Sequence, residues 1–344
     1  MATISDVARV AGVSVSTVSY AINGSRPISE ATRLRVFAAM DALSYQPHAM
    51  ARGLASKRSR ILGLHFPMED RGLGFTELEF VVGAADTAFA GGYHLILSPL
   101  MSEQPRELLQ LTQQGLVDGV ILMEVLQDDP RVEALRALRF PFAMIGRCAD
   151  NRGIDYVDTD FESTMSDAVC YLAALGHTSL AYITQSHQTF DSGYGPVVRT
   201  CATFTQTLLQ HDIAGAIYFC GASAADGNAI LRTIFEEQPA VTALLAMNDR
   251  ALVGIVQGLD DLGYSLPADI SLVTLVSSMR IGELFRPPVT TFAVPSSEMA
   301  RLGVELLIDR LENPAHPIRQ LLIPCTMVDQ GSAAAPAHMH VVRV

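Results

Sequence analysis

Side chains that could carry out catalysis or hold a metal ion are few in this sequence, and they do not have the spacing of known catalytic or metal-binding motifs. His338 and His340 lie in an Ala/Pro-rich segment near the end, and two histidines do not make a metal site. Segment 221–225 (GASAA) lacks the second glycine of the GxSxG nucleophile motif. No cysteine has the CxxC or Cys/His spacing of a structural zinc site; the five are Cys148, Cys170, Cys201, Cys220 and Cys325. The sequence therefore predicts no metal, no cofactor and no enzyme.

One pair of acids, Asp158 and Asp160 in the sequence DTD, could act as paired carboxylates. The pair lies between an apolar run and a helical pattern, where an aspartate more often caps the helix or links two structural units. We therefore favour a structural role for both residues.

The composition favours a cytoplasmic protein of several domains. A chain of 344 residues, 49 % of them hydrophobic, is long enough for two or three units with apolar cores. The first residues lack the basic run and apolar run of a signal peptide, and nowhere do roughly 18 uncharged apolar residues follow one another. The odd, scattered set of cysteines fits reduced core residues.

The charge is distributed unevenly along the chain. The net charge of −12 is unusual for a protein that binds nucleic acid, yet residues 1–60 carry eight arginines or lysines against three acids. This segment is therefore +5, and the rest of the chain is −17. A basic head on an acidic body would hold a phosphate backbone with the head while the body repels it.

The segment 3–23 predicts two short helices joined by a tight turn. Apolar residues recur at helical spacing from Ile4 to Ala11, and Gly12 supplies the left-handed residue that ends this helix. Ala8, Gly12 and Val18 have the spacing of a helix-turn-helix, which needs little bulk where the helices cross and a positive φ at the turn. A plain helical hairpin is the alternative interpretation.

The second of these helices is the candidate DNA reader. It would turn short side chains toward a major groove, where they can contact base edges and thymine methyl groups; these are Val15, Ser16, Thr17 and Tyr20. A third helix, capped by Ser29, presents an apolar face from Val36 to Leu43 and closes a small core. The basic segment 47–59 contains Gly53 and has no clear amphipathic stripe, so we expect either a helix that orders only on DNA or a flexible linker.

From residue 61 onward, short apolar runs alternate with longer helical patterns. The expected strands are ILGLHF (61–66), YHLILS (93–98), VDGVILM (117–123), FAMIG (142–146), LAYIT (180–184), AIYF (216–219), TALLA (242–246) and ISLVTLV (270–276). This alternation is typical of α/β units with mostly parallel sheets, and its length suits two lobes. Ligands of such sheets bind beyond the carboxyl ends of the strands, which here means the cleft between the lobes.

The segment TISDVARVAGVSVSTVSYAINGSRPISEATRLRVFAAMDALSYQPHAMARGLASKRSRILGL (3–64) resembles the amino-terminal signature of the LacI/GalR (lactose-repressor) family of bacterial transcription regulators. Further landmarks occur in the family's order: VDGVIL (117–122), LGH (175–177), Asn248-Asp249, PADISLV (267–273) and PPVTTF (287–292). The resemblance covers essentially the whole chain.

The resemblance implies an α head followed by an α/β body. The head is a helix-turn-helix domain (1–46) with a hinge helix (47–59), and the body (60–331) is a two-lobed, periplasmic-binding-protein-like effector and dimerisation domain. We expect an N-lobe at about 60–160 and 291–321, a C-lobe at about 161–290 and 322–331, crossovers near 160, 290 and 322, and a disordered tail at 332–344.

The resemblance also implies which residues bind DNA. The full set is Thr3, Ser14, Val15, Ser16, Thr17, Tyr20, Asn23, Ser29, Thr32, His48, Ala51, Arg52 and Leu54. In the family, the leucine that matches Leu54 wedges into the minor groove of a palindromic operator, a mechanism that kinks DNA. Members most often have arginine where Tyr20 stands, so the usual half-site is in doubt.

For the effector, the resemblance points to Phe75, Arg199, Asn248 and Val276. In the family, residues matching Asn248 and Arg199 hydrogen-bond the ligand, and aromatic residues line the cleft near Phe75. Sugar-responsive members have an aspartate near Val276, and valine cannot make charge-assisted bonds to sugar hydroxyls. We therefore expect a phosphorylated or modified sugar or another polar or anionic metabolite, and we expect Asp249 to cap a helix.

The sequence thus predicts a DNA-binding transcription regulator, a repressor, controlled by a small molecule. We expect a homodimer or higher oligomer that binds double-stranded DNA and no membrane. The alternative, a solute-binding protein of a transport system, would share the two lobes but would need a signal peptide and would not carry the head. Specific binding of duplex DNA discriminates between the two.

Overall fold

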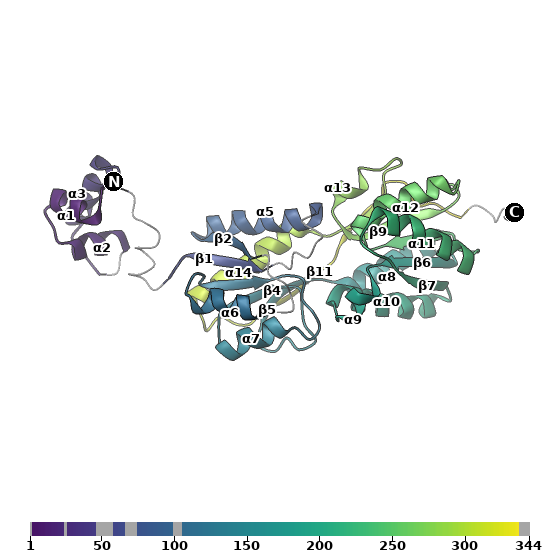
Figure 1. Ribbon diagram of the computed structural model, residues 1–344, viewed down its shortest axis with the longest axis horizontal. Coiled ribbons are helices and arrows are strands. Elements are labelled where there is room, and N and C mark those ends of the chain that lie inside the picture. The colour runs from purple at the N-terminus through teal and green to yellow at the C-terminus, as the bar shows by residue number, and fades with distance from the viewer. Residues whose placement is uncertain (1, 24–25, 46–57, 66–73, 99–104, 337–344) are drawn as a thin grey trace.

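The computed structural model describes residues 2–23, 26–45, 58–65, 74–98 and 105–336. These residues form a small helical head and a body of two α/β lobes (Figure 1). None of the helices in this part of the chain has the length and apolar character that crossing a membrane requires.

The head contains the helix-turn-helix that the spacing predicts, with α1 at Ile4–Ala11, α2 at Val15–Asn23 and α3 at Glu30–Ala42. Thr3 and Asp6 form a capping box at the start of α1, and Gly12 ends the helix with a φ of 65°. The three helices share an apolar core of Val7, Ala8, Ala11, Val18, Ala21, Val36 and Ala39. The expected hinge at 47–59 lies outside the described residues, except for its last two.

The chain enters the body through a cluster of hydrogen bonds at Asp118. The Asp118 carboxylate accepts from the backbone N–H of Ser59 at 2.6 Å, from the Ser59 hydroxyl at 2.9 Å and from the backbone N–H of Arg60 at 2.9 Å. Arg58 donates to the carbonyl of Leu311 at 2.9 Å. The end of the hinge is therefore attached directly to the first lobe.

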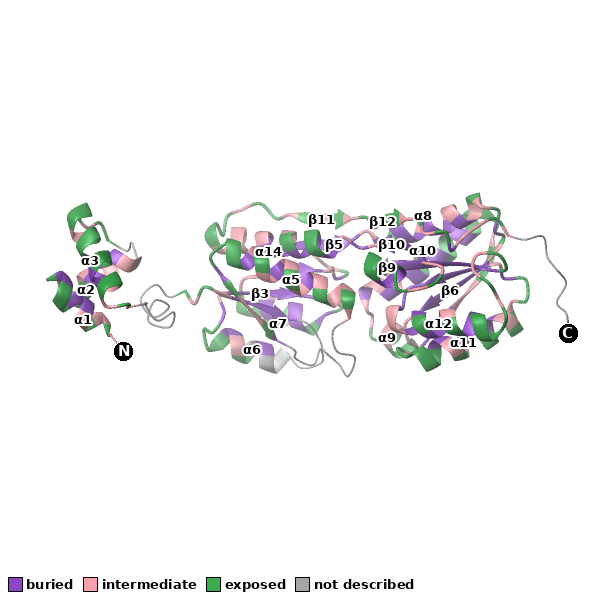
Figure 2. Cartoon of the chain, turned by 90° about the horizontal axis from the view of Figure 1, so that it is seen from above, coloured by how far each residue is buried: buried purple, intermediate pink, exposed green. Residues whose placement is uncertain are grey.

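The first lobe is a six-stranded parallel sheet covered by helices on both faces. Its strands run in the order β11-β5-β4-β3-β1-β2, with β1 at Ile61–His65, β2 at His94–Ser98, β3 at Gly119–Leu122, β4 at Phe142–Ile145, β5 at Asp155–Thr159 and β11 at Gln320–Ile323. One face packs against α5 (Phe75–Ala90) and α14 (Ser296–Glu312), and the other packs against α6 (Pro105–Gln113) and α7 (Pro130–Leu138). Figure 2 shows the buried strands between the half-exposed helices.

The second lobe repeats this plan. Its strands run in the order β12-β10-β9-β8-β6-β7, with β6 at Ser179–Thr184, β7 at Ala214–Phe219, β8 at Ala243–Ala246, β9 at Ser271–Ser277, β10 at Thr290–Ala293 and β12 at Thr326–Val328. Only the β10–β12 pair of this sheet is antiparallel among the described strands. The helices are α8 (Phe161–Ala174), α9 (His187–Asp191), α10 (Gly195–His211), α11 (Ala224–Glu237), α12 (Asp249–Asp261) and α13 (Met279–Gly282).

Helix α12, whose first turn reaches the cleft, packs very closely on α11. A Cβ atom on Gly254 would lie 1.7 Å from the carbonyl oxygen of Ala224, and one on Gly227 would lie 2.1 Å from that of Ala251. No side chain fits at either crossing point, so both glycines set the position of α12.

The chain passes between the lobes three times, and two of the expected positions need correction. The first passage follows β5 at residue 160, as expected. The second follows β10, which pairs with β9 in the second sheet, so it lies at 294–295 and not near 290. The third separates β11 from β12 at 324–325 and not near 322, because each short strand belongs to a different sheet.

The expected disordered tail at 332–344 is wrong for its first residues. The Ser332 side chain is fully buried and accepts a hydrogen bond from the backbone of Thr290 at 2.8 Å. The Ala334 carbonyl lies 2.9 Å from Nε2 of His177, a buried residue of the second lobe. Small and polar residues are not sufficient for disorder when their backbone groups find partners. Residues 337–344, with His338 and His340, lie outside the described residues.

Candidate functional site

The start of α2 is the exposed face of the helix-turn-helix. Val15 is 43 % exposed and Ser16 is also exposed, while Val18 faces the core of the head. Ser14 accepts a hydrogen bond from the backbone of Thr17 at 3.1 Å and so caps the helix. Short side chains at this helix start leave room for close approach to a base edge or a phosphate.

The other expected DNA contacts fall into two groups. Some lie near helix starts: the Thr3 hydroxyl donates a hydrogen bond to Asp6, and the hydroxyls of Ser29 and Thr32 are hydrogen-bonded at 2.8 Å. Tyr20 lies on α2, where the Arg26 guanidinium stacks over its ring at 5.3 Å from the ring centre. The remainder, His48, Ala51, Arg52, Leu54 and the side chain of Asn23, lie outside the described residues. Their roles stay predictions.

A cleft of about 610 Å³ lies between the carboxyl ends of the two sheets. Its described lining combines charged, amide, hydroxyl and apolar side chains from both lobes. This size suits a small metabolite. In the described part of the chain, no three His, Cys, Asp or Glu side chains come together as metal ligands would.

Both edges of the cleft are closed by hydrogen bonds between the lobes. On one edge, the Thr76 hydroxyl of α5 donates to Asp249 at 3.0 Å, and the Ser278 hydroxyl donates to Glu79 at 2.7 Å. On the other edge, the backbone of Gln127 donates to Gly193 at 2.8 Å. The structure is therefore a closed state of the two lobes.

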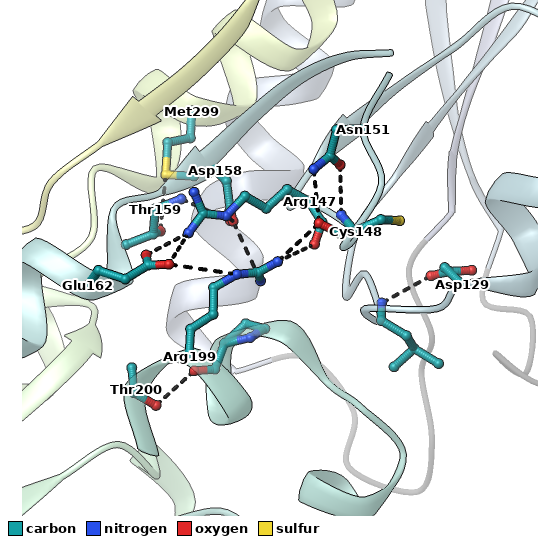
Figure 3. Close-up of polar contacts among 12 residues, drawn as sticks. Asp129, Arg147, Cys148, Asn151, Asp158, Thr159, Glu162, Arg199, Thr200 and Met299 are labelled. Carbon is teal, nitrogen blue, oxygen red and sulfur yellow. Dashed lines mark hydrogen bonds and ion pairs between the residues drawn. The ribbon is translucent and has the colours of Figure 1, made fainter. Parts of the chain in front are cut away.

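A cluster of four charged side chains connects the lobes at the floor of the cleft (Figure 3). Arg147, after β4, contacts Asp158 at 3.3 Å and Glu162 of α8 at 2.6 Å. Arg199 of α10 donates to the carbonyl of Arg147 at 2.9 Å and approaches Asp158 at 4.0 Å. Burial raises the pKa of Asp158 to about 7, although Arg199 and Arg147 lower it. The cluster therefore ties the two lobes together.

Two of the expected effector residues do not line this cleft. Arg199 is absent from the lining of the cleft, and its guanidinium donates to the carbonyls of Arg147 and Cys148 in the first lobe. Phe75 is 47 % exposed and points away, on the same helical stripe as the exposed Leu78 and Val82. The residue that faces the cleft from this helix turn is its neighbour Thr76, and Phe80 lies one turn further on.

Asn248 lines the cleft, but its amide is already bonded within the protein. Its side-chain oxygen accepts from the backbone of Ala251 at 3.2 Å, and its nitrogen donates to the carbonyls of Cys220 and Gly221. Asn248 is thus the N-cap of α12, and the expected capping role of Asp249 is wrong. Asp249 instead faces the cleft, where burial raises its pKa to about 6.

Val276 also lines the cleft, in a strained backbone conformation. Its φ is 53°, at the point where the register between β9 and β10 shifts. A β-branched residue rarely adopts this left-handed region. Val276 lies on the same lobe as Asn248, at the end of β9.

Sequence reasoning missed the residues that define this cleft. Arg147, Glu124 and Tyr194 are isolated in sequence, and only the fold brings them together with Asp158. The DTD sequence did carry a signal, since Asp160 caps α8 by accepting from Ser163 and Asp158 joins the cluster between the lobes. Both agree with the expected structural roles.

Comparison with known proteins agrees with this architecture. Residues 3–48 match the family described as bacterial regulatory proteins, lacI family, and residues 169–333 match the periplasmic binding protein-like domain. The head of this chain is a lacI-family DNA-binding domain. A curated relative of this chain is the HTH-type transcriptional repressor PurR of Vibrio atlanticus (strain LGP32), 28 % identical over 327 residues, which cover 93 % of this chain and 95 % of the relative.

Other named repressors align over equally long stretches. The ribose operon repressor of Escherichia coli (strain K12) is 28 % identical over 97 % of this chain and 100 % of its own length. The crystal structure of the lac repressor dimer bound to operator and the anti-inducer ONPF superimposes with a TM-score of 0.82, at 25 % identity, over 97 % of this chain and 99 % of that one. These relatives are named as repressors, not as enzymes.

Proposed function

We propose that this chain is a dimeric transcriptional repressor whose affinity for a palindromic operator changes when a small molecule occupies the cleft. The observation that carries the proposal is the joining of a helix-turn-helix head to a closed, ligand-sized cleft in one chain. A solute-binding protein of a transport system does not need a helix-turn-helix head. The alignment with named repressors over nearly their whole length supports the same function.

In this proposal, residues 1–46 read the DNA, 47–59 form the hinge and the body senses the effector. The hinge is attached to the first lobe at Asp118, so a movement of that lobe changes the position of both heads in a dimer. An effector alters operator affinity only if it binds the two arrangements of the lobes unequally. The proposal includes a cytoplasmic location, because a bacterial operator lies there.

The effector is a small metabolite of the size that the cleft admits. One relative, the ribose operon repressor, carries the name of a sugar. The cleft of this chain offers hydroxyl, amide and carboxylate groups beside apolar ones, which suits a polar molecule with one apolar face.

Selection of DNA fragments by the purified protein, followed by footprinting, tests this function. We expect a palindrome of roughly 14–20 base pairs, because a symmetric dimer must read related half-sites. Binding should weaken steeply as salt rises, since the basic head displaces counterions from phosphates. An asymmetric monomer site, or an affinity that does not depend on salt, would contradict the proposal.

A further inference from the structure

Helix α14 extends from the cleft to the residues where the chain enters the first lobe. It begins directly after the second crossover between the lobes, at 294–295, and ends at Glu312. A helix of 17 residues is about 25 Å long, because each residue adds 1.5 Å. Of the three crossovers, this is the one whose chain continues from the second lobe into the first.

The amino-terminal end of α14 lies at the cleft and is bonded to the second lobe. Met299, in the first turn, and Val294, just before the helix, are buried and line the cleft. The backbone N–H of Val294 donates to the carbonyl of Ser277, at the end of β9 in the second lobe, at 3.1 Å. A change in the contents of the cleft or in the position of the second lobe therefore acts directly on this end of the helix.

The carboxyl-terminal end of α14 holds the last residues of the hinge. The Leu311 carbonyl accepts the hydrogen bond from Arg58 at 2.9 Å, and the Glu312 carboxylate lies 3.6 Å from the Arg60 guanidinium. This guanidinium also lies over the ring of the buried Tyr93, at 4.8 Å from its centre. Arg60 has a φ of 56°, in the left-handed region that a side chain rarely adopts. Such a conformation persists only where the surrounding contacts impose it.

Between its two ends, α14 is packed tightly into the first lobe. Its buried face, with Ala300, Val304 and Leu307, belongs to the apolar core of this lobe. A Cβ atom on Gly303 would lie 2.6 Å from Cγ1 of Ile145, so the helix lies against β4 with no room for a side chain. Closely packed helices move as units, by small sliding displacements. A displacement at one end of α14 therefore reaches the other end.

We propose that α14 couples the cleft to the hinge, so that a ligand that displaces Met299 also displaces the end of the helix that holds Arg58 and Arg60. This inference rests on the proposed function, because it names the element that transmits the state of the effector cleft to the DNA-binding head. The coupling is reciprocal: binding of the operator, which fixes the hinge, favours one position of α14 at the cleft. An effector acts by binding the two positions of the helix unequally.

A double-mutant cycle in the full-length protein tests this coupling without a known effector. Met299→Ala removes side-chain volume at the cleft end, and Glu312→Lys replaces the attraction to Arg60 by repulsion at the hinge end. The two substitutions lie about 20 Å apart along the helix. A gel-shift assay measures the affinity for the selected operator and for unrelated DNA in the wild type, both single variants and the double variant.

We expect Met299→Ala alone to change operator affinity about fivefold, and to change it by less than about twofold when Glu312→Lys is present, because the hinge then no longer follows the helix. Substitutions so far apart normally have independent effects, so purely structural roles for the two residues would give additive changes. Affinity for unrelated DNA should be the same with and without Met299→Ala, since it depends on the charge of the head.

Glu305→Lys is the matched control for the hinge end. Glu305 lies on the same helix, pairs with Arg301 at 2.8 Å and is 42 % exposed, compared with 55 % for Glu312. Its replacement makes the same charge reversal away from the hinge, so Met299→Ala should keep its full effect in this background. If Met299→Ala does not fold, Val294→Ala takes its place at the cleft end.

Three results overturn the proposal: additive effects of the cleft and Glu312→Lys substitutions, a cleft variant that binds the operator as the wild type does, or an equal loss of the cleft effect with Glu305→Lys. Wild-type protein that binds no specific DNA site refutes the proposed repressor function instead. Specific operator binding with additive effects refutes only the role of α14.

Discussion

Replacing Arg199 by methionine tests whether this residue joins the lobes or binds the effector. Arg199 donates to two carbonyls of the first lobe, those of Arg147 at 2.9 Å and Cys148 at 3.2 Å. Its guanidinium also lies 4.0 Å from Asp158, and the side chain is only 10 % exposed. Methionine retains most of the length and apolar contact of arginine but removes every one of these polar contacts.

The expected loss follows from these contacts. A hydrogen bond from a charged group contributes about 1.5–3 kcal/mol, and removal of one partner of a buried ion pair destabilises by about 3–5 kcal/mol. The loss of free energy should lie at the lower end of the range for a buried ion pair, because Asp158 keeps Arg147 as a partner at 3.3 Å. We expect Arg199→Met to lower the free energy of unfolding by about 3 kcal/mol, which in a body of this size lowers the Tm by roughly 5–10 °C.

Thermal unfolding followed by circular dichroism measures this loss, since the chain has no tryptophan. Arg152→Met is the matched control: Arg152 pairs with Asp150, but its side chain is 90 % exposed, so its replacement should leave the Tm unchanged. If Arg199 instead contacted the effector, its loss would reduce ligand affinity while the ligand-free Tm stayed at the wild-type value. That outcome would refute the role assigned to the cluster.

Four further predictions concern the hinge and the cleft. Leu54→Ala should weaken specific DNA binding much more than non-specific binding, because only a kinked operator admits the wedge; equal losses in a gel-shift assay would make the hinge a plain tether. Asp118→Ala removes three hydrogen bonds at the end of the hinge and should weaken operator affinity while the head keeps its non-specific affinity; unchanged operator affinity would contradict the attachment. Val276→Asn should raise the free energy of unfolding by about 1 kcal/mol, because asparagine tolerates a positive φ better than valine; destabilisation would show that packing outweighs strain. Asp249 has a pKa of about 6 in the folded protein and 3.8 in its ordinary state, so the free energy of unfolding should fall as the pH rises from 4 to 6 and Asp249 ionises. In urea titrations, Asp249→Asn should remove this part of the pH dependence. If the free energies of unfolding of the wild type and the variant change in parallel with pH, the pKa shift is refuted.

The head and the strands could be predicted because their signals are local. The cap at Thr3, the left-handed Gly12 and the apolar spacing of α1 lie within a few residues of one another, and each has one clear physical meaning. The eight expected apolar runs all became strands. The strands that were missed, β5, β10, β11 and β12, are short or carry polar residues such as Asp155 and Asp158.

The cleft was predicted less well, because its chemistry depends on orientation and not on residue type. An arginine such as Arg199 can bind a polar ligand, but here its guanidinium donates hydrogen bonds to two carbonyls of the other lobe. Phe75 misses the cleft because neighbouring residues of a helix point about 100° apart. No sequence pattern pairs Glu124 with Tyr194 or brings Asp249 near Glu77, since the two residues of each pair lie in different lobes and far apart in the sequence.

The order of the strands has a consequence for the synthesis of the protein. Helix α14 and strand β11 complete the first lobe, yet a ribosome makes them after almost all of the second lobe. Until then, the buried face of α5, with Phe80, Ala84 and Ala88, has no partner to cover it, and a nascent chain exposes it. The head, whose core ends at Ala39, is complete much earlier. A ribosome that stalls midway therefore releases a folded DNA-binding head without the body that would regulate it.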